Sequence, residues 1–230
     1  CIGCLPPCLS LCVPPPIPFL LNSYITSNYS NQEIASRLTF FPPRVSGGGG
    51  ASSAVGTYTL SPVPSLPSSG LRSVSLQPST GLGSGPTNGL YPSPAGPLCT
   101  IGYVLPSGLS LTLTFHRSSP PRPRLATVMS HGNASDCGTM LERNAQIAKA
   151  TGGTVVAWDY MGYGASAGGR VQGVTDEWQV YDGMAEVMAW VCDGGMRAAL
   201  EEAGGEGHQD TDEVFLYGQS VGTGPTVWAA

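Results

Sequence analysis

The stretch that decides the fold is Val214-Phe215-Leu216-Tyr217-Gly218-Gln219-Ser220-Val221-Gly222-Thr223-Gly224-Pro225. It begins with apolar residues typical of a short strand, continues through a glycine-flanked turn, and ends in residues that suit the start of a helix. This G-x-S-x-G pattern predicts a nucleophile elbow, in which a serine at the tip of a sharp strand-to-helix turn projects its hydroxyl above a sheet. Ser220 is therefore the candidate nucleophile. In such an elbow the two glycines, here Gly218 and Gly222, stand where the backbone packs too closely for a β-carbon. Gln219 and Val221 lie between them and Ser220.

The chain contains a second match to this pattern, Gly164-Ala165-Ser166-Ala167-Gly168. Glycine is abundant, at 32 of 230 residues, so a chance match is expected. Ser166 lies well past the preceding apolar run and is followed by glycines, which is typical of a loop serine. Ser220 directly follows a strand pattern and precedes a helix pattern in whose first turn Pro225 is tolerated. The context therefore favours Ser220.

The alternation of apolar residues upstream predicts an α/β fold. Strands are expected at 99–105, 109–115, 125–129, 154–158 and 213–217, and helices at 137–150 and 175–192. A hairpin followed by alternating strands and helices is the first half of a doubly wound, mostly parallel sheet. Ligands of such sheets bind at the carboxyl ends of the strands, where the loops after residues 129, 158 and 217 come together.

The loop after residue 129 reads Ser130-His131-Gly132-Asn133-Ala134. In α/β-hydrolases the corresponding loop supplies the second N–H of the oxyanion hole. We expect the N–H groups of Asn133 and Val221 to form this hole, with Gly132 allowing a close approach of the backbone. We expect His131 to brace the loop by hydrogen bonds rather than to act as a base. Asp159 is expected to cap or brace its own loop.

Composition divides the chain into three parts. Residues 1–45 are predicted to be a cysteine-rich N-terminal segment with a short amphipathic helix at 33–41. Residues 46–97 are rich in glycine, serine and proline, and we expect a disordered linker because such a segment buries too little to offset its ordering entropy. Residues 98–230 are the predicted globular domain. The net charge of -5, with a single lysine, excludes an electrostatic footprint for nucleic acid.

Four of the seven cysteines, Cys1, Cys4, Cys8 and Cys12, crowd the N-terminus. They are interpreted either as S-palmitoylation sites, where several acyl chains give stable membrane anchoring, or as an unmodified tail. A metal site there lacks supporting histidines, and no metal or cofactor is predicted. The sequence contains no run of 18 or more apolar residues, so no membrane-spanning helix is predicted. The other three cysteines are scattered, which favours a reducing compartment over a disulfide framework.

Three motifs together resemble those of the α/β-hydrolase domain-containing protein 17 family, in order and spacing, over about residues 98–230. They are Ser130-His131-Gly132-Asn133-Ala134, Asp159-Tyr160-Met161-Gly162-Tyr163-Gly164-Ala165-Ser166 and Leu216-Tyr217-Gly218-Gln219-Ser220-Val221-Gly222-Thr223. Residues 34–43, after the clustered cysteines, are also similar to a segment of that family.

The resemblance implies a membrane-associated serine hydrolase that removes palmitate from cysteines of other proteins. Its partners would be S-acylated proteins as substrates and the membrane surface. The resemblance also implies that Cys1, Cys4, Cys8 and Cys12 are themselves palmitoylated. The protein would then be peripheral, on the cytoplasmic face of the plasma membrane or of endosomes.

The chain departs from this family pattern after Ser220. Serine hydrolases of this fold carry their acid and then their histidine after the nucleophile, and residues 221–230 contain neither. We therefore expect an incomplete α/β-hydrolase fold, an N-terminal fragment with little or no activity of its own. The alternatives are a generic esterase or peptidase of the same fold, or a non-catalytic membrane-tethered scaffold. A nucleotide-binding module is disfavoured, because the glycine spacing at 162–168 does not fit a dinucleotide fingerprint.

Overall fold

The computed structural model describes residues 58–63, 70–76, 97–169 and 175–230. The predictions for the four N-terminal cysteines and for a helix at 33–41 lie outside these residues. None of the described helices has both the length and the apolar character needed to span a bilayer.

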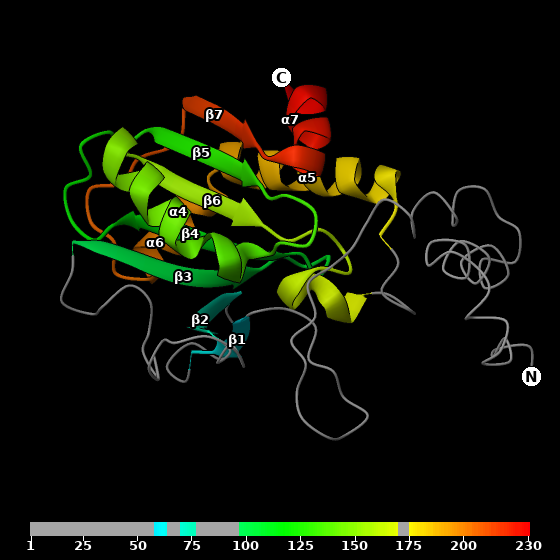
Figure 1. The fold of residues 1–230 in the computed structure, drawn as a ribbon. Coiled ribbons are helices and arrows are strands. Elements are labelled where there is room, and N and C mark those ends of the chain that lie inside the picture. The colour runs from blue at the N-terminus through cyan, green and yellow to red at the C-terminus, as the bar shows by residue number, and fades with distance from the viewer. Residues whose placement is uncertain (1–57, 64–69, 77–96, 170–174) are drawn as a thin grey trace, which may run out of the picture.

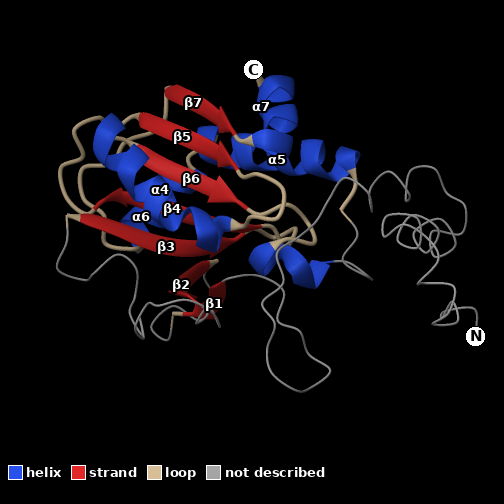
Figure 2. Cartoon of the chain, viewed as in Figure 1, coloured by secondary structure: helices blue, strands red, loops and turns tan. Residues whose placement is uncertain are grey.

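A mixed sheet with helices on both faces organises the described chain (Figures 1 and 2). The strand order is β1-β2-β3-β4-β6-β5-β7. The strands are β1 (Tyr58–Pro62), β2 (Leu71–Leu76), β3 (Leu98–Val104), β4 (Ser110–His116), β5 (Leu125–Ser130), β6 (Thr154–Trp158) and β7 (Glu213–Gly218). The expected parallel pairing is found in β6, β5 and β7, whereas the strands from β1 to β4 pair antiparallel, as does β4 with β6. The α/β class predicted from the sequence is therefore confirmed.

Helix α4 covers one face of the sheet, and α5 and α6 cover the other (Figure 1). The helices are α4 (Cys137–Thr151), α5 (Glu177–Cys192), α6 (Gly195–Glu202) and α7 (Thr223–Ala229), with 3-10 turns η1 (Gly164–Gly169) and η2 (Ser220–Gly222). Helix α4 ends at Gly152, whose φ of 73° lies in the left-handed region that glycine accepts without strain. Helix α6 was not predicted, because Gly194 and Gly195 at its start offer no side-chain cap. It forms because Met196, Ala199 and Leu200 share one buried face.

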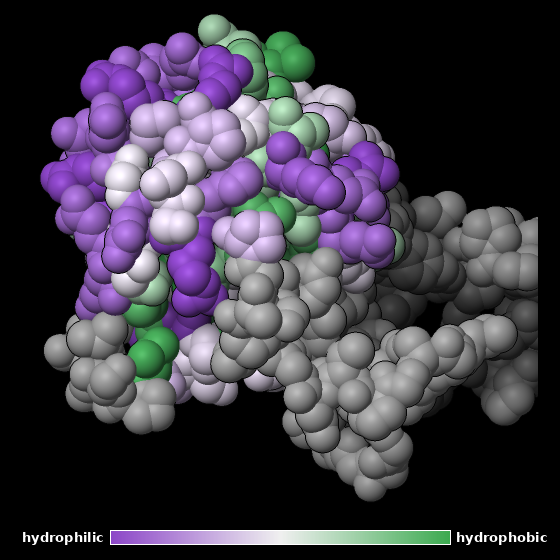
Figure 3. All heavy atoms as spheres, turned by 90° about the vertical axis from the view of Figure 1, so that its left-hand side faces the viewer, coloured by the Kyte–Doolittle hydropathy of each residue, from purple (hydrophilic) through white to green (hydrophobic). Residues whose placement is uncertain are grey.

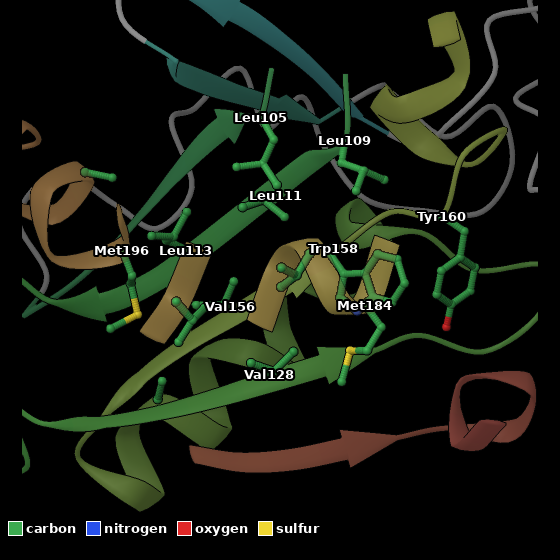
Figure 4. Close-up of a cluster of buried hydrophobic side chains, with 14 of the residues drawn as sticks. Leu105, Leu109, Leu111, Leu113, Val128, Val156, Trp158, Tyr160, Met184 and Met196 are labelled. Atoms are coloured by element: carbon green, nitrogen blue, oxygen red, sulfur yellow. The ribbon is translucent and has the colours of Figure 1, made fainter. Parts of the chain in front are cut away.

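The larger of two apolar clusters lies between the sheet and α5 and α6 (Figure 4). Strands β5 and β6 are buried along their whole length, which is why apolar residues occur on both faces of each strand rather than alternating with polar ones. The labelled side chains of this cluster are Leu105, Leu109, Leu111, Leu113, Val128, Val156, Trp158, Tyr160, Met184 and Met196. Trp158 is fully buried and its indole N–H donates to Ser130 Oγ at 3.1 Å. This hydrogen bond helps to hold the carboxyl end of β5 in place.

The sheet also extends into residues 46–97, which were predicted to be a disordered linker throughout. β1 and β2 form an antiparallel hairpin, and β2 pairs with β3 at Leu71↔Tyr103 and Arg72↔Gly102. The linker prediction is therefore wrong for β1 and β2. Composition alone does not reveal this hairpin. Tyr58 and Val74 are both buried, and the burial of a few apolar residues offsets the ordering entropy of a short hairpin.

A buried cap fixes the start of α4. Asp136 Oδ1 accepts the backbone N–H of Thr139 at 2.9 Å, and Thr139 Oγ1 accepts that of Asp136 at 3.1 Å, which together form a capping box. Asp136→Ala is expected to lower the free energy of unfolding by about 1–2 kcal/mol, measured by urea denaturation. Asp193→Ala, at the exposed end of α5, is the control and should change it by less than about 0.5 kcal/mol. Equal losses in the two variants would contradict the role of the cap.

The amino ends of β5 and β7 meet at a largely hydrophilic surface, which faces the viewer in Figure 3. Arg122 pairs there with Glu213, and Arg124 with Asp212 at 2.5 Å. These ion pairs are about half exposed, so they contribute little to stability. The residues of the predicted site lie at the opposite, carboxyl ends of the strands.

Candidate active site

Ser220 lies at the tip of a sharp turn between β7 and α7. Its φ is 52°, in the left-handed region that non-glycine residues rarely occupy, and its side chain is exposed. The turn continues through η2 into α7, so the strand–turn–helix geometry predicted from the sequence is present. Strain of this kind persists only where the surrounding structure holds it in place, and it concentrates at functional sites.

The two flanking glycines are required by close packing rather than by their φ angles. A β-carbon on Gly218 would lie 2.5 Å from both the Gly222 oxygen and Thr226 Oγ1. A β-carbon on Gly222 would lie 2.3 Å from the Ser130 oxygen and 2.6 Å from that of His131. The backbone of the elbow is thus pressed against the end of β5, which leaves no room for a side chain at either glycine.

Gln219 connects the elbow to the loop after β5. Its N–H donates to the Ser130 oxygen at 3.0 Å, and its carbonyl accepts the N–H of Gly222 at 2.9 Å. A β-carbon on Gly132 would stand 3.5 Å from the Gln219 oxygen, so the two segments are in contact there. Val221 follows in the first turn of η2, where N–H groups have no partner inside the helix.

Asn133 is held in a second strained turn. Its Oδ1 accepts the Tyr163 hydroxyl at 2.8 Å and the N–H of Ala134 at 3.1 Å. Ala134 has a φ of 54°, and it is one of three non-glycine residues with positive φ in the described chain, the others being Ser119 and Ser220. Two of these three strained positions therefore belong to the elbow and to the loop that packs against it.

His131 braces this loop, as the sequence predicts. It is 1% exposed, and its Nδ1–H donates to the Gly132 oxygen at 2.9 Å. Its own carbonyl accepts the Tyr160 hydroxyl at 2.6 Å, and the Tyr160 ring lies 4.1 Å from the imidazole. Burial lowers the pKa of His131, with the Asp159 carboxylate opposing that shift. The imidazole is therefore a neutral structural group whose remaining nitrogen, Nε2, lies 3.6 Å from Asp159 Oδ1.

Asp159 is fully buried and does more than brace its own loop. Its carboxylate accepts the Tyr58 hydroxyl at 2.5 Å, the N–H of Cys137 at 2.8 Å and the N–H of Ala165 at 3.1 Å. Burial raises its pKa, and the nearby His131, the Tyr58 hydroxyl and the N–H of Cys137 oppose the rise. Tyr58 was not anticipated as part of this region, because it lies in a low-complexity stretch with no local signal of a buried partner.

Ser166, the serine of the second G-x-S-x-G match, is a structural residue. It is 1% exposed and lies in η1 rather than in a loop. Its Oγ donates to the Asp159 carbonyl at 3.0 Å and accepts the N–H of Ser110 at 2.7 Å. The hydroxyl both donates and accepts a hydrogen bond and is buried, so Ser166 is not available to attack a substrate.

No histidine in the described residues, which include all three of the chain, hydrogen-bonds to the Ser220 hydroxyl. His208 Nε2 donates to the His116 oxygen at 2.9 Å, and His116 ends β4 beside the start of β6, at the opposite end of the strands from Ser220. In the described ranges, no three side chains of His, Cys, Asp or Glu group as metal ligands. A surface cavity with Gln179 and Asp182 in its wall contains none of the predicted site residues.

Comparison with known protein families finds no family model that matches the chain.

Proposed function

We propose that the protein is a serine hydrolase of acyl esters or thioesters with Ser220 as its nucleophile. The observation that carries this proposal is the positive φ of Ser220 at an exposed strand-to-helix turn whose two glycines leave no space for a side chain. The strand order β3-β4-β6-β5-β7, with β4 antiparallel to β6, supports the finer assignment to an α/β-hydrolase fold. Such an elbow exposes one hydroxyl above a sheet and has no evident purpose in packing.

In the proposed reaction, Ser220 Oγ attacks the acyl carbonyl carbon and loses its proton. The N–H groups of Val221 and Asn133 stabilise the oxyanion that forms, and the thiolate or alkoxide then leaves. Water releases the acyl group from Ser220 in a second step. Since no described histidine faces Ser220, the proton of the first step passes to solvent or to a base in solution. We therefore expect the chain to react slowly, with the rate limited by this proton transfer.

The family resemblance narrows the proposed substrate to palmitoyl thioesters on protein cysteines. It also supports peripheral attachment to the cytoplasmic face of membranes through the N-terminal cysteines. A generic esterase or peptidase would share the elbow but would act on a substrate with a different acyl group.

A non-catalytic scaffold of the same fold is the second candidate. The lack of a hydrogen bond between any described histidine and Ser220 favours it. The scaffold and the hydrolase differ in whether Ser220 forms a covalent adduct.

Reaction with a fluorophosphonate probe tests the proposal. We expect slow labelling of the intact 230-residue chain, faster when imidazole is added as an external base, and loss of this labelling in Ser220→Ala. Ser118→Ala is the matched control, because it removes an exposed serine hydroxyl from the loop after β4, and it should keep the labelling. Labelling that is equal in Ser220→Ala and in the unchanged protein, or absent with imidazole, would favour the scaffold.

A further inference from the structure

The buried carboxylate of Asp159 joins the start of α4 to a strand far upstream. Its Oδ2 accepts the Tyr58 hydroxyl of β1 at 2.5 Å, across 101 positions of sequence. Its Oδ1 accepts the N–H of Cys137 at 2.8 Å. Since Cys137 is the first residue of α4, this bond fixes the point at which the loop that carries Asn133 enters the helix.

The same carboxylate lies beside the other end of that loop. His131 Nε2 is 3.6 Å from Asp159 Oδ1 and makes no hydrogen bond within the part of the chain that the structure describes. The His131 oxygen, in turn, lies 2.6 Å from where a β-carbon on Gly222 would stand. Asp159 therefore lies against both ends of the loop, and the loop lies against the elbow.

The space around this carboxylate is shaped to hold it. A β-carbon on Gly164, whose φ is 46°, would lie 2.0 Å from Asp159 Oδ2. Ser166 fixes the backbone of Asp159 from the other side, through its bond to the Asp159 carbonyl at 3.0 Å. A buried carboxylate is retained only where donors compensate its desolvation, and here the Tyr58 hydroxyl joins the N–H groups of Cys137 and Ala165 as a donor.

The β1–β2 hairpin has a short attachment to the rest of the sheet. β2 pairs with β3 at two positions, and the Gly70 oxygen accepts the N–H of Val104 at 2.9 Å. The Tyr58 ring is 2% exposed and packs in the apolar cluster that contains Cys137 and Met129. Docking of this hairpin thus places the Tyr58 hydroxyl directly on Asp159.

We infer that Tyr58 and Asp159 are positioning residues for Ser220, and that the β1–β2 hairpin is part of the site. The inference rests on the proposed function. The Tyr58 hydroxyl holds the Asp159 carboxylate on the N–H of Cys137. This contact keeps the strained loop with Ala134 in the shape that turns the Asn133 N–H toward the elbow. Without the hydroxyl, the carboxylate loses one donor and its hold on the loop weakens.

Hydrogen exchange in the intact chain tests this directly. Tyr58→Phe keeps the buried ring and removes only the hydroxyl, and we expect the amides of 133–139 to exchange about ten-fold faster at neutral pH. Tyr181→Phe is the matched control, because the Tyr181 hydroxyl bonds to exposed Glu177, and it should leave these amides unchanged. The inference is overturned if Tyr58→Phe leaves them unchanged, or if it accelerates exchange equally in α6.

A pH series separates a polar role of Tyr58 from simple packing. The titratable groups facing Asp159 are Tyr58 from β1, His131 after β5, and Asp136 and Cys137 at the start of α4. The pKa of Asp159 is raised on folding, so its ionisation destabilises the native state as the pH rises through that folded-state pKa. The Tyr58 hydroxyl reduces this loss. The ratio of exchange rates between Tyr58→Phe and the unchanged protein should therefore fall as the pH drops below that pKa, because a neutral carboxyl makes a weaker hydrogen bond than a carboxylate.

Asp159→Asn completes the comparison. In that background the same ratio should be smaller and independent of pH, because the amide oxygen of asparagine accepts a weaker, uncharged hydrogen bond from the Tyr58 hydroxyl. A ratio that is constant with pH, or that is undiminished in Asp159→Asn, would show that the hydroxyl does not act through the Asp159 carboxylate and would overturn the inference.

The probe reaction distinguishes this inference from the proposed function. Tyr58→Phe should lower the limiting rate of labelling at Ser220 about ten-fold and leave the half-saturating probe concentration unchanged. If no variant is labelled at Ser220, the proposed function fails, while the exchange result still decides whether Tyr58 orders the loop. If labelling is normal in Tyr58→Phe, the positioning role fails and the proposed function stands.

Discussion

Gly222→Ala is expected to lower the free energy of unfolding by about 3 kcal/mol and to abolish probe labelling at Ser220. The added β-carbon would lie 2.3 Å from the Ser130 oxygen and 2.6 Å from the His131 oxygen. Both obstacles are backbone atoms of the β5 end, so neither can rotate away as a side chain would. The elbow must therefore move off β5, and the strained φ of Ser220 would relax with it.

Gly224→Ala provides the control, because it is the same substitution two residues later, at the start of α7. The nearest atom to its β-carbon is the Tyr181 hydroxyl oxygen at 3.9 Å, an ordinary contact. Within α7 this change should be neutral or stabilise by up to about 1 kcal/mol, because alanine favours helix more than glycine does. Urea denaturation measures both variants. Equal stability of the two would contradict the close packing of the elbow on β5.

Trp158→Ala is expected to lower the free energy of unfolding by about 3–5 kcal/mol. Trp158 is 0% exposed, and a β-carbon on Gly183 of α5 would lie 2.8 Å from its ring, so the helix packs directly on the indole. The substitution leaves a cavity and also removes the donor to Ser130 Oγ. Probe labelling should fall as well, since Ser130 accepts the Gln219 N–H of the elbow.

Trp178→Ala is the matched control for this variant. Trp178 is 66% exposed, so the same truncation should change the free energy of unfolding by less than about 0.5 kcal/mol. Thermal and urea denaturation of the two variants would show whether the sheet and α5 share the core described here. Similar losses in both would contradict that arrangement.

Elements with a strong local pattern were predicted well from the sequence. The apolar runs at β5 and β6, the hairpin of β3 and β4 and the helix that ends at Gly152 all depend on neighbouring residues, which the sequence displays directly. The elbow was predicted for the same reason, because its strand, its glycines and its helix are contiguous.

Features that depend on distant partners were missed or only partly predicted. β1 and β2 lie in a serine- and proline-rich stretch, and they are stabilised by an edge of the sheet that is remote in sequence. Asp159 was expected to serve its own loop, whereas its partners come from β1, α4 and η1. Nothing near Tyr58 in the sequence indicates that its hydroxyl will reach a buried carboxylate 101 positions away.

The most direct test of the central claim is a crystal structure of the chain after reaction with a phosphonate probe. The account predicts a bond from Ser220 Oγ to phosphorus, with one phosphoryl oxygen about 2.7–3.1 Å from the backbone nitrogens of both Val221 and Asn133. An adduct on another residue would contradict the assignment of the nucleophile. A phosphoryl oxygen that points into solvent, away from these two N–H groups, would contradict the assignment of the oxyanion hole.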